Sequence, residues 1–198
     1  MGTQWTDVLL WKQFQSGDRS AFAKLVNQYK DVLYGYGKRF SADNELVRDC
    51  IQDIFLTIWH RREHLNEPSN IKFYLMKALR QRIVRQSTKW KKALSLNDIS
   101  ADRPEFAIDL EHRIDSMEPV NSALKVYINK LTPRQREIIY LRFYENMKQN
   151  EIADLMGLNV QSIYNLQHSA LIALKKWMDY KSIHDCLITL CLFAPTLF

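Results

Sequence analysis

Twenty residues in the last third of the chain, Gln149 to His168, have the types and spacing of a motif that contacts DNA. Small Ala153 stands fifth in this segment, Gly157 ninth and β-branched Ile163 fifteenth. A small side chain lets two helices cross closely, and a glycine can adopt the positive φ that ends the first helix. Asn159 can then cap the second helix through its side-chain oxygen. The segment predicts a helix-turn-helix, with the alternative that it is a plain pair of packed helices.

The second helix of this pair, from about Val160 onward, would carry the side chains that read bases. Amides, hydroxyls and an imidazole on its outward face can hydrogen-bond to base edges in a major groove. These candidates are Gln161, Ser162, Tyr164, Asn165 and His168.

A second surface with chemical character runs from Lys72 to Lys92, where eight residues are basic and none is acidic. Apolar residues recur every four positions along one side of a predicted helix that begins near Ile71, namely Leu75, Leu79 and Ile83. Three aromatic side chains lie between the cations: Phe73, Tyr74 and Trp90. This composition is typical of a surface that meets phosphates and stacks on exposed bases, and the alternative is a basic face that is only solvated.

The elements that must position these residues are helical. The chain has 198 residues, 46% of them hydrophobic and 25% charged, which is ordinary for a soluble globular protein. Apolar residues recur at three- and four-residue intervals, and glycine and proline are few, so we predict an all-α protein without a sheet. Amphipathic helices are predicted within residues 22–36, 46–59 and 123–131. Thr132, Pro133 and Gln135 predict the cap and first turn of another helix that runs to about Glu145.

Charge divides the chain into parts. Residues 1–95 carry a net charge of +8, residues 96–120 one of −5 and residues 121–198 one of +3. This predicts two small helical domains, 1–95 and 121–181, joined by an acidic linker, 96–120, and followed by an apolar tail, 182–198. The acidic residues of the linker either solubilise it or lie against the basic helix when no nucleic acid is bound. The tail is too short for the roughly 20 residues that span a bilayer, and it either packs on the protein or stays exposed for a partner or a membrane surface.

Nothing in the sequence predicts a catalytic or metal centre. Three widely separated cysteines fit neither a disulfide framework nor a zinc site, which indicates a reducing compartment, and the N-terminus lacks the features of a secretory signal. Among the five histidines, only His60 and His64 have helical ligand spacing, and no third ligand is near them in sequence. We expect a cytoplasmic protein, not an enzyme, with no cofactor, no metal ion and no small-molecule substrate.

Two segments resemble signatures of the sigma-70 family of bacterial RNA polymerase sigma factors, extracytoplasmic-function (ECF) type. Residues 49–59, Asp-Cys-Ile-Gln-Asp-Ile-Phe-Leu-Thr-Ile-Trp, resemble the Asp-Leu-Val-Gln-Glu-x-Phe-x-x-x-Trp of region 2. Residues 131–137, Leu-Thr-Pro-Arg-Gln-Arg-Glu, resemble the Leu-Pro-x-Arg-Gln-Arg-Glu that opens region 4. Residues 151–153 and Gly157 match its Glu-Ile-Ala and turn glycine. The resemblance implies two helical domains, region 2 and region 4, without the domain that lies between them in larger sigma factors.

The resemblance also implies a role for each surface. Asp49, Gln52 and Asp53 would dock on core RNA polymerase, and helical spacing places them away from the predicted core side of Cys50, Ile54 and Ile58; solvation of this face is the alternative. The helix from Val160 would read the minus-35 promoter element as a duplex. The basic helix would meet the minus-10 element as it opens, with backbone contacts from Lys77, Arg80, Arg82, Arg85 and Lys89. An unstacked base would be held by Gln81, Phe73 and Tyr74. A cognate anti-sigma factor is the further partner that the resemblance implies.

The chain departs from the family pattern in both DNA-contacting helices. Gln81 and Arg85 stand where asparagine and aspartate are common, so the promoter sequence cannot be carried over. The upstream helix also has uncharged residues where basic ones are frequent, namely Tyr164, Leu166 and Ser169. Phosphate contacts near the upstream element are therefore expected from Arg134, Arg136, Arg142, Lys148, Lys175 and Lys176.

Two other functions stay open from the sequence alone. One is a helix-turn-helix transcriptional regulator that acts without polymerase and receives a signal through its first domain. The other is an RNA- or single-strand-binding protein built around residues 72–92. Stable association with core polymerase is expected only of a sigma factor.

Overall fold

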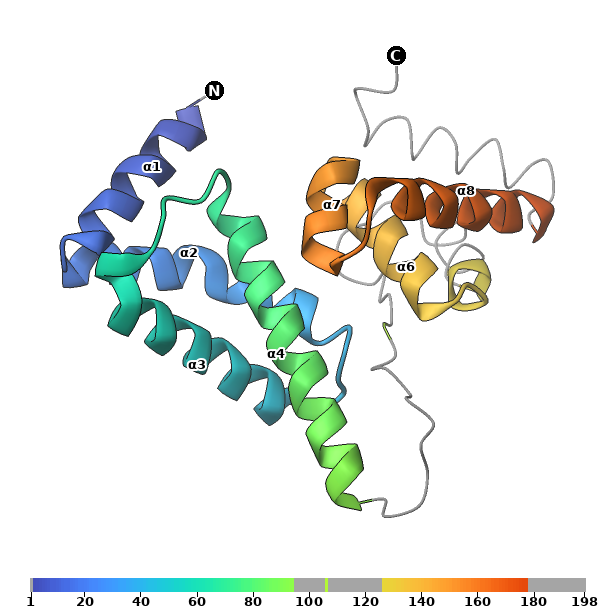
Figure 1. Ribbon diagram of the computed structural model, residues 1–198, viewed down its shortest axis with the longest axis horizontal. Helices are drawn as coiled ribbons and strands as arrows, with labels where there is room; N and C mark the ends of the chain where they lie inside the picture. Colours follow the sequence, from blue (N-terminus) through green and yellow to red (C-terminus); the bar gives the residue numbers. More distant parts are fainter. Residues whose placement is uncertain (1, 95–105, 107–125, 178–198) are drawn as a thin grey trace. The chain divides into compact units, whose positions relative to one another are not determined.

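The computed structural model describes residues 2–94, 106 and 126–177. These residues form helices and their connections, and no strand occurs among them, which confirms the all-α prediction (Figure 1). The chain divides into two compact units, Met1–Pro104 and Glu105–Phe198. Apart from Phe106, the predicted linker lies outside the described residues, and so does the predicted tail. The role of the tail and the contact between the linker and the basic helix therefore stay predictions.

The first unit is a helical bundle. Its elements are α1 (Gly2–Gln15), α2 (Arg19–Gly37), α3 (Asn44–Arg61), the 3₁₀ turn η1 (Arg62–His64) and α4 (Ile71–Leu94). Helices α2, α3 and α4 pack against one another, and α1 packs on α2 (Figure 1). The predicted apolar side of α4 is confirmed, because Leu75, Leu79 and Ile83 are fully buried.

Short polar side chains set the starts of these helices. Asp18 Oδ1 accepts hydrogen bonds from the backbone N–H groups of Ser20 and Ala21, at 2.7 and 3.2 Å, at the start of α2. Asp43 Oδ1 does the same for Glu45 and Leu46 at the start of α3. The first N–H groups of a helix have no partner within it, so each carboxylate satisfies donors that would otherwise lack one. These caps therefore fix the residues at which α2 and α3 begin.

Helix α1 is an element that the sequence patterns did not predict. Its side chains Trp11 and Phe14 are fully buried in the aromatic part of the core. The Trp11 ring lies 5.1 Å from Phe14 and meets Tyr74 of α4 edge-on at 5.8 Å. The Tyr29 hydroxyl donates to Asp7 at 3.1 Å and ties α2 to α1. Helix α1 thus helps to position α4, which carries the basic surface.

The second unit holds the helix-turn-helix. Residues 126–129 are helical and are followed by α6 (Pro133–Ile139), the π-helical turn η2 (Tyr140–Tyr144), α7 (Gln149–Met156) and α8 (Val160–Trp177). The predicted capping box is confirmed, since Thr132 Oγ1 accepts from the Gln135 N–H and the Gln135 side chain accepts from the Thr132 N–H at 3.0 Å. The helix predicted to reach Glu145 instead leaves α geometry at Tyr140, where the wider turn begins.

Phe106 belongs to the second unit, although it lies in the middle of the predicted linker. Its ring is 1% exposed and packs 5.7 Å from the ring of Tyr140. Tyr140 in turn stacks on Tyr144 at 5.6 Å. An aromatic column therefore fixes this point of the connecting chain to the π-helical turn.

Candidate nucleic-acid and polymerase interfaces

The turn between α7 and α8 has the geometry that the sequence predicted. Gly157 ends α7 with φ 66° and ψ 41°, in the left-handed region. A Cβ added to Gly157 would meet no atom within 4 Å, so the backbone conformation and not space requires glycine here. Asn159 Oδ1 accepts from the Ser162 N–H at 2.7 Å and caps α8. Both predicted turn residues are confirmed.

The inner faces of α7 and α8 are held by apolar contacts. Ile152, Ala153 and Ile163 are buried where the two helices pack together, and the small side chain of Ala153 is buried there as predicted. Polar bonds at the edges add to this packing: Gln149 Nε2 donates to Gln167 Oε1 at 3.3 Å, and Gln135 Nε2 of α6 donates to Ser169 Oγ at 3.0 Å. The orientation of α8 on the unit is therefore fixed from two sides.

The outer face of α8 carries the predicted base-reading residues. Gln161, Tyr164, Asn165 and His168 are exposed, and Ser162 is half-buried. They form two pairs four residues apart: Gln161 Nε2 donates to Asn165 Oδ1 at 3.0 Å, and the rings of Tyr164 and His168 stack at 6.0 Å with an interplanar angle of 7°. The arrangement is a polar and aromatic surface that can meet base edges.

Most of the predicted phosphate-contacting cations near α8 are accessible. Arg134, Lys148, Lys175 and Lys176 are exposed, whereas Arg142 is half-buried and donates to the Met147 carbonyl at 2.9 Å. Arg136 needs a correction, because it is 6% exposed and leaves almost no surface for a phosphate. The cause is that residues 136–141 are buried without interruption on α6 and η2, so that both sides of this short segment face the core.

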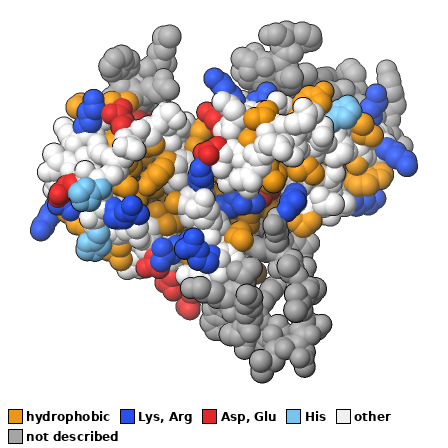
Figure 2. Space-filling model, in the orientation of Figure 1, with side chains coloured by type: hydrophobic (Ala, Val, Ile, Leu, Met, Phe, Trp, Pro, Cys, Tyr) orange, Lys and Arg blue, Asp and Glu red, His pale blue; other side chains and the backbone are white. Residues whose placement is uncertain are grey.

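Along α4, the predicted DNA-contacting residues differ in exposure. Gln81 and Arg85 are exposed, while the others described are half-buried: Phe73, Tyr74, Lys77, Arg80 and Arg82. The side chain of Lys89 lies outside the described residues. Burial raises the pKa of the Tyr74 phenol, against a smaller opposing effect of Arg61, so the hydroxyl stays protonated at neutral pH. Figure 2 shows Lys and Arg side chains spread among hydrophobic ones on the visible face of the described residues.

An ion pair joins two residues that the sequence assigned to different surfaces. The Arg82 guanidinium of α4 donates to the Asp53 carboxylate of α3, and both side chains are partly exposed. Arg82 is a predicted contact to DNA, and Asp53 is a predicted contact to polymerase. The two surfaces therefore meet at this pair, which no spacing along the chain reveals.

The predicted polymerase-docking face has the expected orientation on α3. Asp49 and Gln52 are exposed and Asp53 is half-buried, while Cys50, Ile54 and Ile58 point into the core. The Cys50 thiol donates to Gln86 Oε1 at 3.1 Å, and burial raises its pKa to about 11. Cys50 is therefore an interior residue and not a reactive thiol.

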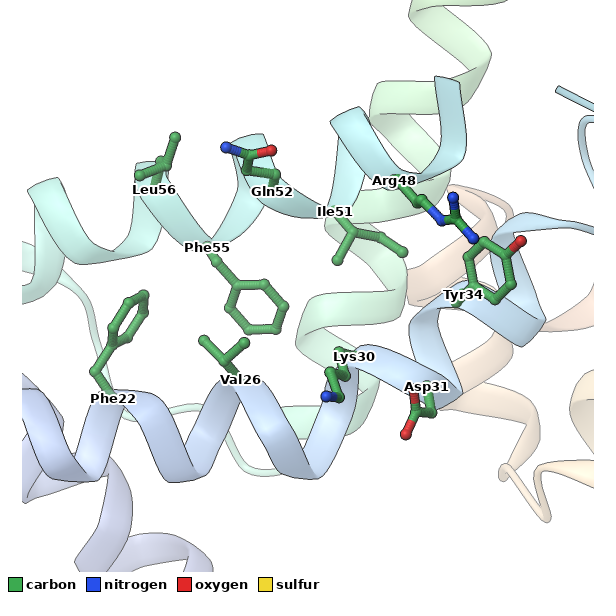
Figure 3. Close-up of a pocket in the computed structure, with 10 residues that line it drawn as sticks. All are labelled: Phe22, Val26, Lys30, Asp31, Tyr34, Arg48, Ile51, Gln52, Phe55 and Leu56. Carbon is green, nitrogen blue, oxygen red and sulfur yellow. The ribbon is translucent and has the colours of Figure 1, made fainter. Parts of the chain in front are cut away.

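A groove of about 580 Å³ lies between α2 and α3, next to this face (Figure 3). Its apolar part includes Phe22, Val26 and Phe55, with Leu56, which is 45% exposed, at the rim. At its other end the Tyr34 ring has the Arg48 guanidinium 5.4 Å from its centre. The remaining lining residues are Lys30, Asp31, Ile51 and Gln52. The groove depends on how two separate helices pack, so no spacing along the chain predicts it.

Within residues 2–94, 106 and 126–177, no group of three or more His, Cys, Asp or Glu side chains could hold a metal ion. None of the helices in that part of the chain combines the length and hydropathy needed to cross a membrane.

Comparison with known proteins matches both units to one family. Residues 25–92 match Sigma-70 region 2, and residues 127–176 match Sigma-70, region 4. The RNA polymerase sigma-E factor of Streptomyces avermitilis is 24% identical over 170 residues, which cover 84% of this chain and 90% of that protein. The ECF RNA polymerase sigma factor SigK of Mycobacterium sp. (strain KMS) is 23% identical over 171 residues, covering 85% and 88%.

Solved structures agree on the fold. The sigma factor RpoE of Bartonella quintana, solved in complex with the anti-sigma factor NepR, aligns with a TM-score of 0.59 at 20% identity over 79% of this chain and 95% of that one. CnrH, solved in complex with the cytosolic domain of CnrY, aligns with a TM-score of 0.57 at 22% identity over 86% and 95%. Regions 2 and 4 together occupy more than half of the chain, and the protein belongs to the sigma-70 family of RNA polymerase sigma factors, in its ECF group.

Proposed function

We propose that this protein binds core RNA polymerase and directs it to a class of promoters through one docking face on α3 and two DNA-contacting helices, α4 and α8. The observation that carries the proposal is a formed helix-turn-helix in a chain that also presents the region 2 face of Asp49 and Gln52. A regulator that acts without polymerase needs only the first of these features. Polymerase supplies the catalysis, so the factor itself needs no catalytic residue.

Helix α8 reads the minus-35 element as a duplex in the major groove. Its exposed candidates lie on the side opposite the buried Ile163, so they can enter a groove without any repacking of the unit. Arg134, Lys148, Lys175 and Lys176 contribute contacts to the flanking phosphates, which fix register and orientation without reading sequence.

Helix α4 meets the minus-10 element as it opens. Exposed Arg85 and half-buried Lys77 and Arg80 face the backbone, while Phe73 and Gln81 receive an unstacked base. Flipping a base out of the stack costs a few kcal/mol, and stacking on an aromatic ring returns about 1–3 kcal/mol of that. Tyr74 is partly engaged by Trp11, so its contribution is the exposed part of the ring.

The α3 face docks on polymerase, and the adjacent groove extends the docking surface. Gln52 belongs to both, so the groove with its apolar side chains adjoins the docking face. A surface with an apolar centre and a charged rim is the usual composition of a specific protein interface. A helix laid along α3 would cover both parts at once.

An anti-sigma factor is the second protein partner, and the cytoplasm is the site of action. The proposal is supported by the relative RpoE, whose solved structure contains the anti-sigma factor NepR. Sequestration by such a partner would account for how a factor with accessible DNA-reading residues is kept inactive. No small-molecule substrate or cofactor is needed for any of these steps.

The test is run-off transcription with sigma-free core polymerase on a library of genomic fragments. We expect discrete start sites that depend on the added protein, and their upstream sequences define the promoter. Absence of start-site selection, or failure of the protein to co-purify with core polymerase in stoichiometric amount, would overturn the proposal in favour of a regulator or a single-strand-binding protein.

Charge reversal tests the docking face separately. Asp49→Arg is expected to weaken polymerase binding by at least tenfold, because it reverses an exposed charge of the proposed docking face. Asp53→Arg should do the same but also removes the ion pair with Arg82, so Asp49→Arg is the cleaner variant. Asp154→Arg, an exposed charge reversal on α7, is the matched control and should leave polymerase affinity unchanged.

A further inference from the structure

Two amide side chains on the outer face of α8 are bonded to each other. Gln161 Nε2 donates to Asn165 Oδ1 at 3.0 Å, and both residues are exposed. Residues four apart are neighbours on a helix surface, so the bond holds both amides in one place. That place is in the first two turns of α8, the end of a recognition helix that meets base edges.

The pair presents one hydrogen-bond acceptor beside one donor. The Gln161 carbonyl oxygen and the Asn165 amide nitrogen take no part in the bond between the two side chains. An amide has an acceptor oxygen and a nitrogen with two protons, so the reverse arrangement would leave the same two functions available. The acceptor-and-donor pattern is therefore a property of the pair and not of one orientation.

This pattern matches one base in the major groove. Adenine shows an acceptor, N7, beside a donor, the N6 amino group, whereas guanine shows two acceptors, cytosine a donor, and thymine an acceptor and a methyl group. We propose that Gln161 and Asn165 together read one adenine of the minus-35 element, with Gln161 accepting from N6 and Asn165 donating to N7. This inference rests on the proposed function, since it requires α8 to lie in the major groove of promoter DNA.

The composition of α8 leaves this discrimination to the amides. From Val160 to Leu174 the helix has no Lys, Arg, Asp or Glu. Bidentate recognition of guanine by arginine is therefore unavailable along this stretch, as is recognition of the cytosine amino group by a carboxylate. The neighbouring exposed pair, Tyr164 and His168, is a stacked ring surface, with Tyr164 51% exposed, and it offers ring faces beside the amides.

The experiment uses holoenzyme made from the full chain and core polymerase, with a duplex promoter library randomised over the upstream element. Wild-type holoenzyme is expected to enrich adenine at one position by about tenfold to a hundredfold, the usual discrimination of a bidentate contact. Gln161→Ala and Asn165→Ala should each reduce that enrichment to below about threefold. The double variant should match either single one, because the two amides act as a unit.

A nearly isosteric change sharpens the test. Asn165→Asp keeps an acceptor for Gln161 Nε2, but it removes the Asn165 donor, so the two groups proposed to contact the base are then both acceptors. The preference at that position is then expected to move from adenine to cytosine, whose N4 amino group is a donor. Asn150→Ala, which removes an exposed amide from α7, is the matched control and should leave the enrichment unchanged.

The outcomes separate this inference from the function on which it rests. If the wild-type holoenzyme selects an upstream element but no adenine preference depends on Asn165, the inference is overturned and the proposed function stands. If the wild-type holoenzyme selects no upstream element, the proposed function fails together with the inference. Thermal unfolding of each variant confirms that loss of selection does not come from loss of folding.

Discussion

Helices α4 and α8, the two proposed DNA-contacting helices, present their polar side chains in different ways. On α8, exposed residues pair with one another along the outer face, Gln161 with Asn165 and Tyr164 with His168. On α4, Arg82 pairs with Asp53 of α3, and Tyr74 packs edge-on against Trp11 of α1. The proposed DNA-contacting side chains of α8 thus take little part in the packing of their unit. On α4, some of the proposed DNA-contacting side chains also contact neighbouring helices.

This difference has a practical consequence for mutagenesis. A substitution on the outer face of α8 should change DNA recognition with little effect on stability. A substitution on α4 changes DNA contact and internal packing together. The following variants separate the two effects, from the largest expected change to the smallest.

Substitutions on the buried sides of α4 and α8 should destabilise the protein by similar amounts. Leu79 of α4 and Ile163 of α8 are both fully buried. Leu79→Ala and Ile163→Ala should each destabilise their own unit by about 2–5 kcal/mol, from lost burial and a residual cavity. Hydrogen exchange read by peptide checks this. Equal loss of protection in both units from one substitution would contradict their division into independent cores.

The turn before α8 should depend on glycine for its backbone alone. Gly157→Ala is expected to cost about 1–2 kcal/mol, because alanine strains at positive φ although no atom obstructs its Cβ. Gly35→Ala is the control, since Gly35 lies within α2 with equally open space, and it should stabilise by up to about 1 kcal/mol. Urea denaturation of each variant measures both. A shift of the same sign in the two would show that the turn does not require the left-handed conformation.

The cap of α8 should contribute a smaller amount. Asn159→Ala removes the acceptor of the Ser162 N–H and is expected to cost about 1 kcal/mol. The denaturation midpoint reports the change, and Asn150→Ala on α7 should stay within about 0.5 kcal/mol of wild type. An Asn159→Ala variant as stable as Asn150→Ala would mean that the cap contributes nothing in solution.

The smallest stability effect is expected at the ion pair of α4. Arg82→Met should cost at most about 1 kcal/mol, because both partners are partly exposed. Arg85 is exposed, so Arg85→Met should change the free energy of unfolding by no more than about 0.5 kcal/mol. Each substitution should remove about one phosphate contact. The slope of the logarithm of the promoter-binding constant of the holoenzyme against the logarithm of the salt concentration should therefore become shallower by about one. A salt slope unaltered by Arg85→Met would remove Arg85 from the proposed backbone contacts.

Sequence patterns predicted what is decided locally. The positive φ of Gly157, the Asn159 cap and the Thr132–Gln135 capping box each depend on a few adjacent residues, and the structure has all three. The apolar side of α4 also follows from spacing alone. These features placed the helix-turn-helix and the basic helix correctly before any packing was known.

The remaining features depend on contacts between distant segments. Helix α1 was missed because its apolar residues 8–11 form a continuous run without a helical stripe, and Leu9 in that run is 58% exposed. The burial of Arg136 cannot be predicted from spacing, because a short helix covered on both sides has no polar face in its sequence pattern. The pairing of Asp53 with Arg82 joins residues 29 positions apart. Such partners are set by how helices cross and not by local spacing.

The packing of Phe106 against Tyr140 also shortens the chain segment that connects the two proposed DNA-contacting helices. Only the eleven residues 95–105 connect the end of α4 to this anchored ring. Even a fully stretched segment of that length reaches no more than roughly 40 Å. Once one of these helices is bound to DNA, the other stays attached to it through this short connection, and its own binding becomes an intramolecular event governed by effective concentration.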